Sequence, residues 1–403
     1  MNDASIQLAH GGGGQLTAEL IAEVILPALG PDANAQNPRA LADAAYLRGG
    51  PECSMGVSPM SPTGVSPVAK PTEASCDNDA AARADSNAPL SRPPCMGETP
   101  MRLTGETPVL RSATWAFTTD SYVVWPLEFP GGDIGKLAVC GTVNDLAVSG
   151  ADAAGLSLSL VLEEGLEIAL LRRVLASAGR AARQAGVRIV TGDTKVVERG
   201  GVKGMILNTS GVGTVWPAAT LGFDRVTPGD KLILSGPLGE HGLAVLCQRQ
   251  GLALRTELAS DCAPLNALCR DLVAQLGPAV KCMRDPTRGG LAAAAVDLAN
   301  ACRCDIELDE AAIPQHRAAR AAADMLGLDL LTVANEGKLL AVVSPAAAEQ
   351  AVAILRAHDL APHAAVIGAV TRPSDQPLVE LLTTIASRRV VPMPYGEELP
   401  RIC

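Results

Sequence analysis

Residues 113–149 read ATWAFTTDSYVVWPLEFPGGDIGKLAVCGTVNDLAVS, and this stretch decides the fold class. The apolar and hydroxyl-bearing residues of 113–120 and of 122–125 predict two strands. After a Pro-Gly-Gly turn, the apolar positions of 133–149 recur with helical spacing. Strands followed directly by a helix are typical of a mixed α/β or α+β domain.

The same alternation extends along the chain in both directions. Helices are predicted over 16–29, 169–185, 241–250, 263–275, 291–301, 318–326 and 346–358. Strands are predicted over 187–190, 205–213, 231–235 and 339–343. We therefore expect two α/β domains, 113–222 and 223–387, with residues 1–48 supplying a glycine flap and a first helix to the first domain.

Composition and charge exclude several classes of protein. Hydrophobic residues make up 48% and charged residues 19% of the 403 residues, which is an ordinary globular balance. The net charge of −10 excludes a typical nucleic-acid binder, and no apolar run reaches the ~18 residues of a membrane span. Residues 1–10 do not resemble a secretory signal, and the eleven cysteines contain no C-x-x-C pair. We expect a cytoplasmic protein with reduced thiols.

Residues 49–112 form a segment rich in Pro, Ser, Thr and Gly. It contains an imperfect repeat, MGVSPMSPTGVSPV at 55–68 and MGETPMRLTGETPV at 96–109. Such a composition buries too little apolar surface to offset the entropy of ordering, so we predict a disordered insert. Docking to a partner is the alternative.

Three carboxylates, Asp120, Asp145 and Asp193, lie where an apolar strand or helix gives way to Gly, Ser, Thr or Asn. Each alone is typical of a capping aspartate. Three in one domain fit Mg²⁺, which takes few carboxylates and is completed by water and substrate phosphates. Lys195 follows Asp193 closely and is a candidate partner for a phosphate, although a solvated lysine is the alternative.

Glycine-rich loops give weaker signals. The run HGGGG at 10–14 allows close approach of backbone to phosphate, but a plain linker is equally compatible with it. The segment PGGDIGKLA is not a P-loop, because Pro130 and Leu137 replace its first glycine and its Ser/Thr. In the second domain, RDPTRGG at 284–290 and ANEGK at 334–338 combine acid, base and glycine, with salt-bridged turns as the alternative reading.

The last residue of the sequence, Cys403, ends a proline-punctuated segment, 388–403. Roughly fifteen extended residues at ~3.3 Å each span ~50 Å, so we predict a mobile tail that carries a thiol into and out of a site. An accidental cysteine on a frayed end is the alternative.

Taken together, these motifs resemble the HypE family of hydrogenase maturation proteins. The resemblance rests on HGGGG, FTTDSYVVWPLEFPGGDIGKLAVCGTVNDLAVSGA, LEEG, TGDTKVV, RDPTRGG, ANEGK and the terminal PRIC. It covers nearly the whole chain except the insert, 49–112. The family lies in the ATP-binding superfamily of aminoimidazole ribonucleotide (AIR) synthetase and selenophosphate synthetase. The resemblance implies a PurM-like fold of two α/β domains, whose N-terminal sheets pair in a homodimer.

It also implies an ATP-dependent carbamoyl dehydratase. The carbamoyltransferase HypF would place a carbamoyl group on Cys403, and the enzyme would dehydrate this S-carboxamide to a thiocyanate. The cyanide would then pass to iron held by a HypC–HypD complex, for the active site of a [NiFe] hydrogenase.

The site residues implied by the resemblance fall into three groups. Mg²⁺ would lie on Asp120, Asp145 and Asp193. ATP would be bound by His10, Gly12, Gly13, Gly14, Asp120, Lys136, Asn144, Asp145, Thr191, Gly192 and Asp193. The catalytic residues would be Cys403, Glu336, Lys195, Asn335, Lys338 and Arg284. Among them Glu336 is the hypothesised base for the N–H protons, because it is an acid in a glycine-bearing loop.

Two other functions stay open. A selenophosphate synthetase-like phosphoryl transferase would share the carboxylates, but it uses a cysteine near the N-terminus, and the first cysteine here, Cys53, lies in the insert. A non-catalytic carrier would ferry on Cys403 a group made elsewhere, and it would not hydrolyse ATP.

Overall fold

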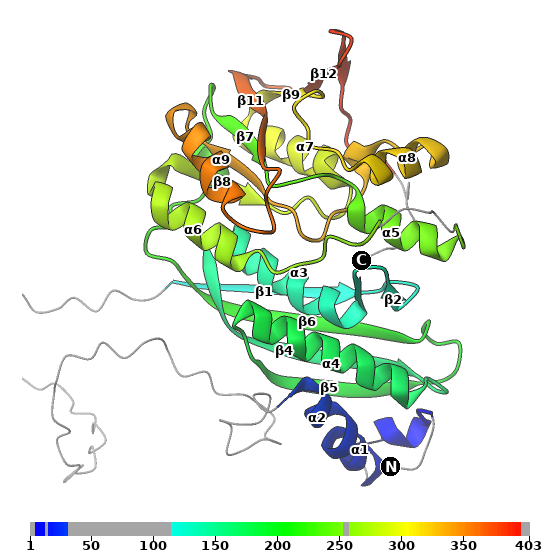
Figure 1. Cartoon of the computed structure of the whole chain (residues 1–403). Coiled ribbons are helices and arrows are strands. Elements are labelled where there is room, and N and C mark those ends of the chain that lie inside the picture. The colour runs from blue at the N-terminus through cyan, green and yellow to red at the C-terminus, as the bar shows by residue number, and fades with distance from the viewer. Residues whose placement is uncertain (1–4, 13–14, 31–113, 253–257, 396–403) are drawn as a thin grey trace, which may run out of the picture. The chain divides into compact units, whose positions relative to one another are not determined.

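The computed structural model describes residues 5–12, 15–30, 114–252 and 258–395 (Figure 1). All of them belong to one compact unit, which takes in Met1–Gly49 and Ala113–Cys403. The predicted insert 49–112 and the end of the predicted tail, Cys403 included, lie outside the described residues.

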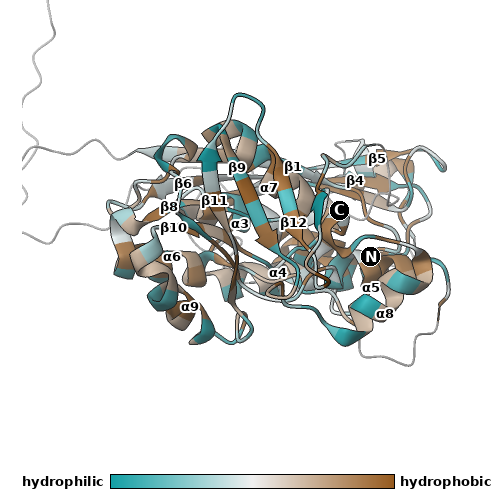
Figure 2. Cartoon of the chain, turned by 90° about the horizontal axis from the view of Figure 1, so that it is seen from above, coloured by the Kyte–Doolittle hydropathy of each residue, from teal (hydrophilic) through white to brown (hydrophobic). Residues whose placement is uncertain are grey.

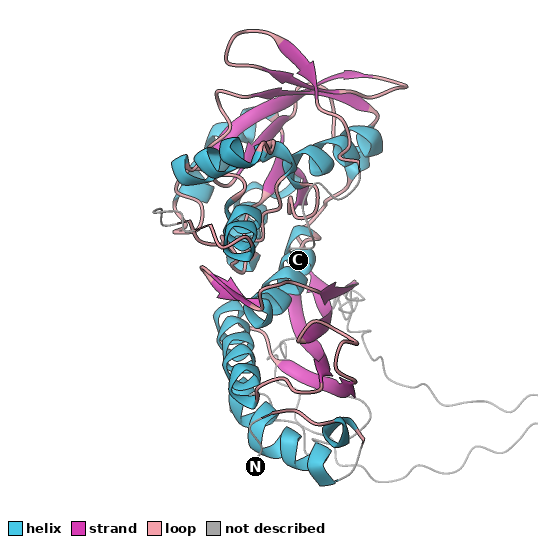
Figure 3. Cartoon of the chain, turned by 90° about the vertical axis from the view of Figure 1, so that its right-hand side faces the viewer, coloured by secondary structure: helices cyan, strands magenta, loops and turns pink. Residues whose placement is uncertain are grey.

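A four-stranded sheet forms the N-terminal part, with the strand order β1-β6-β4-β5. Its strands are β1 (Trp115–Tyr122), β4 (Ala151–Glu163), β5 (Ile189–Val197) and β6 (Met205–Val215). A small hairpin, β2 (Glu128–Phe129) and β3 (Gly132–Asp133), precedes the helix α3 (Ile134–Val148). Helices α3 and α4 (Ile168–Ala185) cover one face of the sheet (Figures 1 and 3).

The other face of this sheet is open. Along β1 the residues Trp115, Phe117, Thr119 and Ser121 are exposed, whereas the alternate residues face α3. Such alternation is typical of a sheet with one solvated face. The predicted strand over 122–125 is wrong, because β1 continues to Tyr122 and its pairing with β6 ends there.

Helix α3 is buried on nearly all sides, since it lies between the two domains. It contacts the first sheet and also α6 (Asn266–Leu276) and β8 (Val280–Arg284) of the second domain. Its N-terminus is capped by Asp133, which accepts the backbone N–H groups of Gly135 and Lys136. The apolar and small residues all round this helix follow from its central position.

The N-terminal segment packs beside β5 and α4. It consists of η1 (Leu8–Gly11), α1 (Gln15–Leu20), the π turn η2 (Ile21–Ile25) and α2 (Leu26–Leu29). The helix predicted over 16–29 is confirmed. The π turn falls just before Pro27, which has no N–H to donate and crowds the carbonyl four residues earlier.

The C-terminal part is built on a seven-stranded sheet of the order β13-β12-β9-β11-β7-β10-β8, antiparallel except for β12 with β9. Its other strands are β7 (Lys231–Leu234), β9 (Cys304–Asp309), β10 (Leu340–Val343), β11 (Ala365–Pro373), β12 (Val379–Leu382) and β13 (Arg388–Val390). Its other helices are α5 (Glu240–Arg249), α7 (Gly290–Cys302), α8 (Arg317–Leu326) and α9 (Ala348–Arg356). Short 3-10 turns are η4 (Phe223–Arg225), η5 (Gly277–Ala279), η6 (Leu330–Thr332) and η7 (Pro345–Ala347).

Both faces of the second sheet are covered at its centre. In β7, Leu232 and Leu234 pack in the cluster that contains α7, and Ile233 packs in the cluster that contains α6 and α9. Strands buried on both faces have continuous apolar sequences, as β7 and β10 do. Helix α8 is amphipathic: its buried residues are all alanines, and hydrophilic residues lie along its other side (Figure 2).

The predicted mixed α/β fold of two domains is confirmed. The domain limits remain a prediction. None of the helices among the described residues is long and apolar enough to span a membrane.

Candidate active site

A small cavity of about 30 Å³ lies where β1 and α3 meet loops of the second domain. It is lined by Asp120, Ser121, Tyr122, Gly141, Asp145, Asp285, Thr287, Arg288 and Glu336. Four of these residues are carboxylic acids, and they come from four separate segments of the chain. The cavity has room for about one water molecule and opens onto the surface at Arg288, whose side chain is 79% exposed.

Asp120 and Asp145 lie on the helix side of the first sheet. Asp120 pairs in register with Thr209, which is buried and donates from its hydroxyl to the Ala138 carbonyl of α3 at 3.0 Å. Asp145 accepts a hydrogen bond from the Thr118 hydroxyl at 2.8 Å. The structure therefore brings these two predicted metal ligands to one cavity.

Asp193 lies on the opposite, open face. Across the sheet, Asp193 is in register with Ser159, Ser159 with Asn208, and Asn208 with Ser121, so these four side chains lie on one face. Along each strand they alternate with the residues that face the helices. β1 and β5 are also the two edges of the sheet, three strand spacings or roughly 14 Å apart. Within one chain Asp193 does not join Asp120 and Asp145, and no group of three metal-ligating side chains occurs among the described residues.

Lys195 pairs with Asp193, at 3.4 Å between Nζ and Oδ1, and both side chains are exposed. Thr191 is exposed on the same face as Asp193. Gly192 is required by close packing, because a Cβ at this position would lie 2.2 Å from the Leu158 carbonyl oxygen. These predicted phosphate-binding residues share the open face or the edge strand, away from the cavity.

The glycine run begins against the same edge strand. His10 is fully buried, and its Nδ1 accepts the backbone N–H of Gln7 at 2.9 Å. With Nδ1 as an acceptor, Nε2 carries the proton, and this atom has no hydrogen-bond partner among the residues that the structure describes. Gly12 lies at the end of η1, whereas Gly13 and Gly14 lie outside the described residues.

The ionisation of the acids in the cavity is strongly perturbed. Burial raises the pKa of Asp285 to about 7, with a further contribution from Asp145. Burial also raises the pKa of Glu336 well above its usual range, and Asp285 and Asp261 raise it further. The pKa of Asp145 is raised by burial too, and Arg284 and Arg288 oppose that shift. Like charges enclosed together favour the protonated forms until a cation enters.

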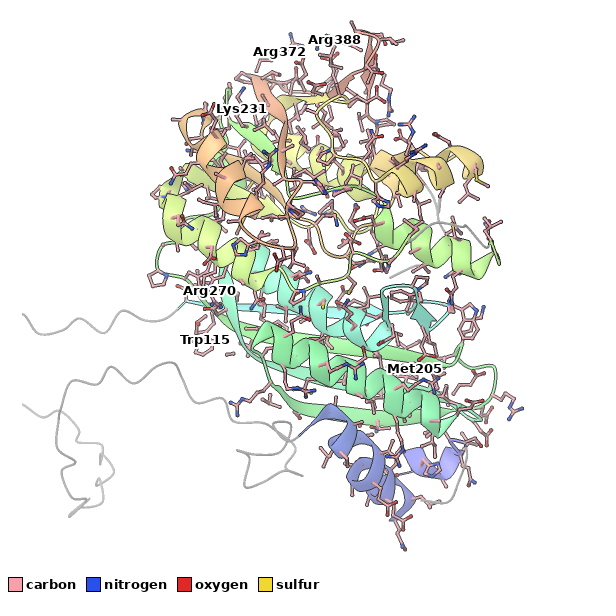
Figure 4. All side chains as sticks on the ribbon, viewed as in Figure 1. Trp115, Met205, Lys231, Arg270, Arg372 and Arg388 are labelled. Atoms are coloured by element: carbon pink, nitrogen blue, oxygen red, sulfur yellow. The ribbon has the colours of Figure 1, made fainter. Side chains whose placement is uncertain are left out.

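Several predicted site residues have structural roles. Asn144 donates to the carbonyls of Ala263 and Glu336 at 3.1 and 3.4 Å and accepts the N–H of Leu265 at 2.7 Å. Lys136 donates to the Gly131 carbonyl at 3.0 Å. Neither lines the cavity, and Asn144 instead ties the two domains together, as does the ion pair between Asp152 and the labelled Arg270 (Figure 4).

The ANEGK loop is held by its polar side chains. Asn335 accepts the N–H of Gly239 at 2.7 Å and donates to the carbonyls of Pro286 and Val333, at 3.0 Å each. Lys338 is buried between Glu240 and Asp261, at 2.8 and 3.1 Å. Of the three polar side chains in this loop, only Glu336 lines the cavity.

The RDPTRGG loop contributes more than its arginine at 284. Arg284 pairs with Asp297 of α7 at 3.5 Å and does not line the cavity, whereas Asp285, Thr287 and Arg288 do. The Arg288 guanidinium lies 3.7 Å from Asp120 Oδ1, so it links the two domains across the cavity. Asp285, Thr287 and Arg288 were not predicted individually, although they lie in the RDPTRGG motif that the sequence analysis identified.

The arrangement suits phosphoryl chemistry. It offers carboxylates for a metal, an exposed guanidinium at the mouth of the cavity for a phosphate, and a buried acid of raised pKa that becomes a strong base once ionised. The residues come from both domains, so the chemistry belongs to their junction.

Comparison with known proteins agrees with this class of fold. Residues 106–215 match the family "AIR synthase related protein, N-terminal domain", and residues 227–378 match "AIR synthase related protein, C-terminal domain". The carbamoyl dehydratase HypE of Rhodobacter capsulatus is 48% identical over 313 residues, which are 77% of this chain and 91% of that protein.

Two solved structures are similar as well. A hydrogenase maturation protein HypE in complex with ATP is 36% identical and has a TM-score of 0.76, with 98% of this chain and 99% of that chain covered. The HypE of a HypE–HypF complex is 41% identical with a TM-score of 0.67, over 70% of this chain and 90% of that chain.

Fold and site thus define a two-domain AIR synthase related protein. Within that class, the chain belongs to the HypE family of carbamoyl dehydratases.

Proposed function

We propose that this chain is an ATP-dependent carbamoyl dehydratase of [NiFe]-hydrogenase maturation, acting on an S-carboxamide carried by Cys403. The observation that carries the proposal is the acid-lined cavity at the domain junction, with Glu336 buried in it. Family membership gives independent support, since a HypE dehydratase aligns over 91% of its length.

The path of the tail supports the role of Cys403. After β13 the described chain continues to Tyr395, and a Cβ on Gly289 would lie 3.5 Å from Pro394. Gly289 directly follows the loop residues that line the cavity. The remaining residues, 396–403, span roughly 26 Å when extended at ~3.3 Å each, which suffices to bring a thiol from this point to the cavity.

The proposed reaction removes one water from the carboxamide in two steps. The γ-phosphoryl group of ATP moves to the carboxamide oxygen, and one N–H proton leaves. The C–O bond then breaks, phosphate departs, and the second N–H proton is finally transferred to the phosphate. The products are the thiocyanate, ADP and phosphate. Glu336 takes the N–H protons, because it is a buried acid that lines the cavity and its raised pKa makes it a strong base once ionised.

Asp120 and Asp145 fit a magnesium ion in part. Mg²⁺ commonly takes only one or two protein carboxylates beside phosphates and waters. When bound, it would neutralise the phosphate charge. The exposed Arg288 would turn from Asp120 to the phosphoryl group. In a dimer that pairs the open sheet faces, Lys195 and His10 of one copy would act on the nucleotide of the other.

We propose a homodimer that pairs through the open face of the first sheet. Trp115 and Phe117, which are 47% and 72% exposed, lie on this face, and exposed large apolar side chains are typical of an interface. Trp115 is labelled in Figure 4. Pairing offers Asp193 of one copy a route to the site of the other. The seven free cysteines among the described residues favour a cytoplasmic location.

The proposed partners follow from the reaction. A HypF carbamoyltransferase must supply the carboxamide, and a HypC–HypD complex that holds iron must accept the cyanide. A solved HypE–HypF complex is among the similar structures, which supports the first of these partners.

Intact mass of the purified chain tests the function. After incubation with HypF, carbamoyl phosphate and ATP, we expect a gain of one carboxamide on Cys403 and then an ATP-dependent loss of one water. A carboxamide that persists in the presence of Mg²⁺ and ATP would leave only a carrier. Absence of any modification on Cys403 would contradict both roles.

A further inference from the structure

We infer that Asp261 is the positioning residue of this enzyme: its carboxylate holds the backbone of the loop that presents Glu336 to the substrate. This inference rests on the proposed function. Asp261 lies between α5 and α6, far from Glu336 in sequence. Its Oδ1 accepts the N–H of Glu336 at 3.2 Å, and its Oδ2 accepts the N–H of Gly337 at 3.1 Å.

The carboxylate is itself fixed. Its side chain is 2% exposed, and Lys338 Nζ lies 3.1 Å from Oδ2. Burial alone would raise the pKa of Asp261, but Lys338 and His241 beside it bring that pKa below its usual range. Asp261 is therefore a buried anion with three donors, which is the arrangement that holds a charged acceptor in one place.

Contact between the two loops leaves no room for displacement. A Cβ on residue 337 would lie 1.8 Å from the Asp261 carbonyl oxygen, so only glycine fits there. From the other side, Asn144 of α3 donates to the Glu336 carbonyl. Asp261 thus fixes the N–H of Glu336 and Asn144 fixes its C=O, while the side chain extends into the cavity.

A base acts only within hydrogen-bond reach of the proton that it removes. A displacement of 1 Å costs on the order of 100-fold in rate. Asn at position 261 would keep one acceptor and turn an NH₂ group toward one of the two backbone N–H groups, so the loop would lose one of its two anchors. The position of Glu336 would change, and loss of the Asp261 charge would also bring the pKa of Glu336 down, because that charge helps to raise it. The nucleotide site would not change.

The test compares single turnovers of the full chain, carbamoylated beforehand on Cys403, by intact mass after Mg²⁺ and ATP are added. We expect Asp261→Asn to slow the loss of water about 100-fold while ATP affinity changes less than about twofold.

Asp305→Asn is the matched control. Asp305 is also buried and paired with a cation, Arg372, at 2.7 Å, but it accepts one backbone N–H, that of Leu378 at 3.0 Å, where Asp261 accepts two. It lies on β9, away from the cavity. We expect this variant to lose stability but to dehydrate at the wild-type rate.

Each other result overturns the inference in a distinguishable way. If wild type loses water and Asp261→Asn loses it equally fast, the positioning role alone is wrong. Equal slowing in Asp305→Asn would reduce Asp261 to a general stabilising role. If the carbamoylated wild type itself loses no water, the proposed function fails and the inference fails with it.

Discussion

Glu336 carries the proposed chemistry at the scale of a single residue. Replacing it with Gln removes the base and keeps the shape of the side chain, so ATP binding should persist and dehydration should fall at least ~100-fold. Single-turnover intact mass and an ATP titration measure the two effects. Glu349→Gln, on the exposed surface of α9, serves as the control. Normal thiocyanate formation in Glu336→Gln would remove this residue from the mechanism.

Asp285 makes stability depend on pH. Its pKa rises from 3.8 in the unfolded chain to about 7 in the folded chain, so the folded state binds the proton more tightly. The stabilising contribution is complete below pH ~4 and is lost as the pH rises through ~7, by at most ~4 kcal/mol. Asp285→Asn should therefore unfold at higher temperature than wild type at pH 8.

The gain in Asp285→Asn should disappear as the pH falls toward 4, where both Asp285 and its replacement are neutral. Thermal unfolding of the nucleotide-free protein at several pH values measures it. A gain that is independent of pH would show that the titration of Asp285 is not its cause.

Among single residues, those that belong to local motifs could be predicted from the sequence. Residues whose role depends on contacts with distant parts of the chain could not. Glu336 was predicted because it lies in a glycine-bearing loop. Asp261 could not be, since its partners are 75 and 76 residues away and its own surroundings show no pattern. Asp193 was grouped with Asp120 by type, whereas the strand register that separates them is a property of the sheet.

Among the elements, those with strong periodicity were predicted well. Helix α4 and strands β7 and β10 are confirmed within a few residues of their predicted limits. β4 was not predicted, although Leu and Ser alternate along it with the period of a half-buried strand. Strands β9, β12 and β13 were also missed, because they are short or rich in polar residues and gain stability mainly by pairing with neighbours. β11 was missed as well, although its first six residues, AVIGAV, form an apolar run.

The approach of α3 to β1 depends on Gly141. A Cβ at this position would lie 2.2 Å from the hydroxyl oxygen of Tyr122, which lines the cavity. Gly141→Ala should therefore cost about 1–3 kcal/mol of stability, as overpacking of a core does. Removing the hydroxyl with Tyr122→Phe should recover part of that loss.

A double-mutant cycle on these two positions, measured by denaturant unfolding, tests the contact. We expect non-additivity, with the double variant more stable than the sum of the single changes predicts. Strict additivity would mean that Tyr122 does not limit the approach of the helix.

For the whole molecule, the cavity is a product of domain association. β1 and α3 bring Asp120 and Asp145, and the loops after β8 and before β10 bring Asp285, Arg288 and Glu336. Neither domain alone holds the full set, so the junction that Asn144 fixes is itself part of the site. Motifs could indicate which loops carry chemistry, but only the packing of the two domains brings them together.

The separation of Asp193 from Asp145 makes a prediction about the proposed homodimer. If the open sheets pair, Asp193 of one copy completes the site built on Asp145 of the other. Asp145→Asn and Asp193→Asn homodimers should then be inactive. A heterodimer of the two variants, purified through two different tags, should regain about half of the wild-type activity, because one of its two sites is intact. A dimer of two differently tagged Asp145→Asn chains is the control and should stay inactive. No recovery in the mixed dimer would contradict this arrangement and would mean that Asp145 and Asp193 act within one chain. The first sheet would then have to rearrange to bring these two carboxylates together.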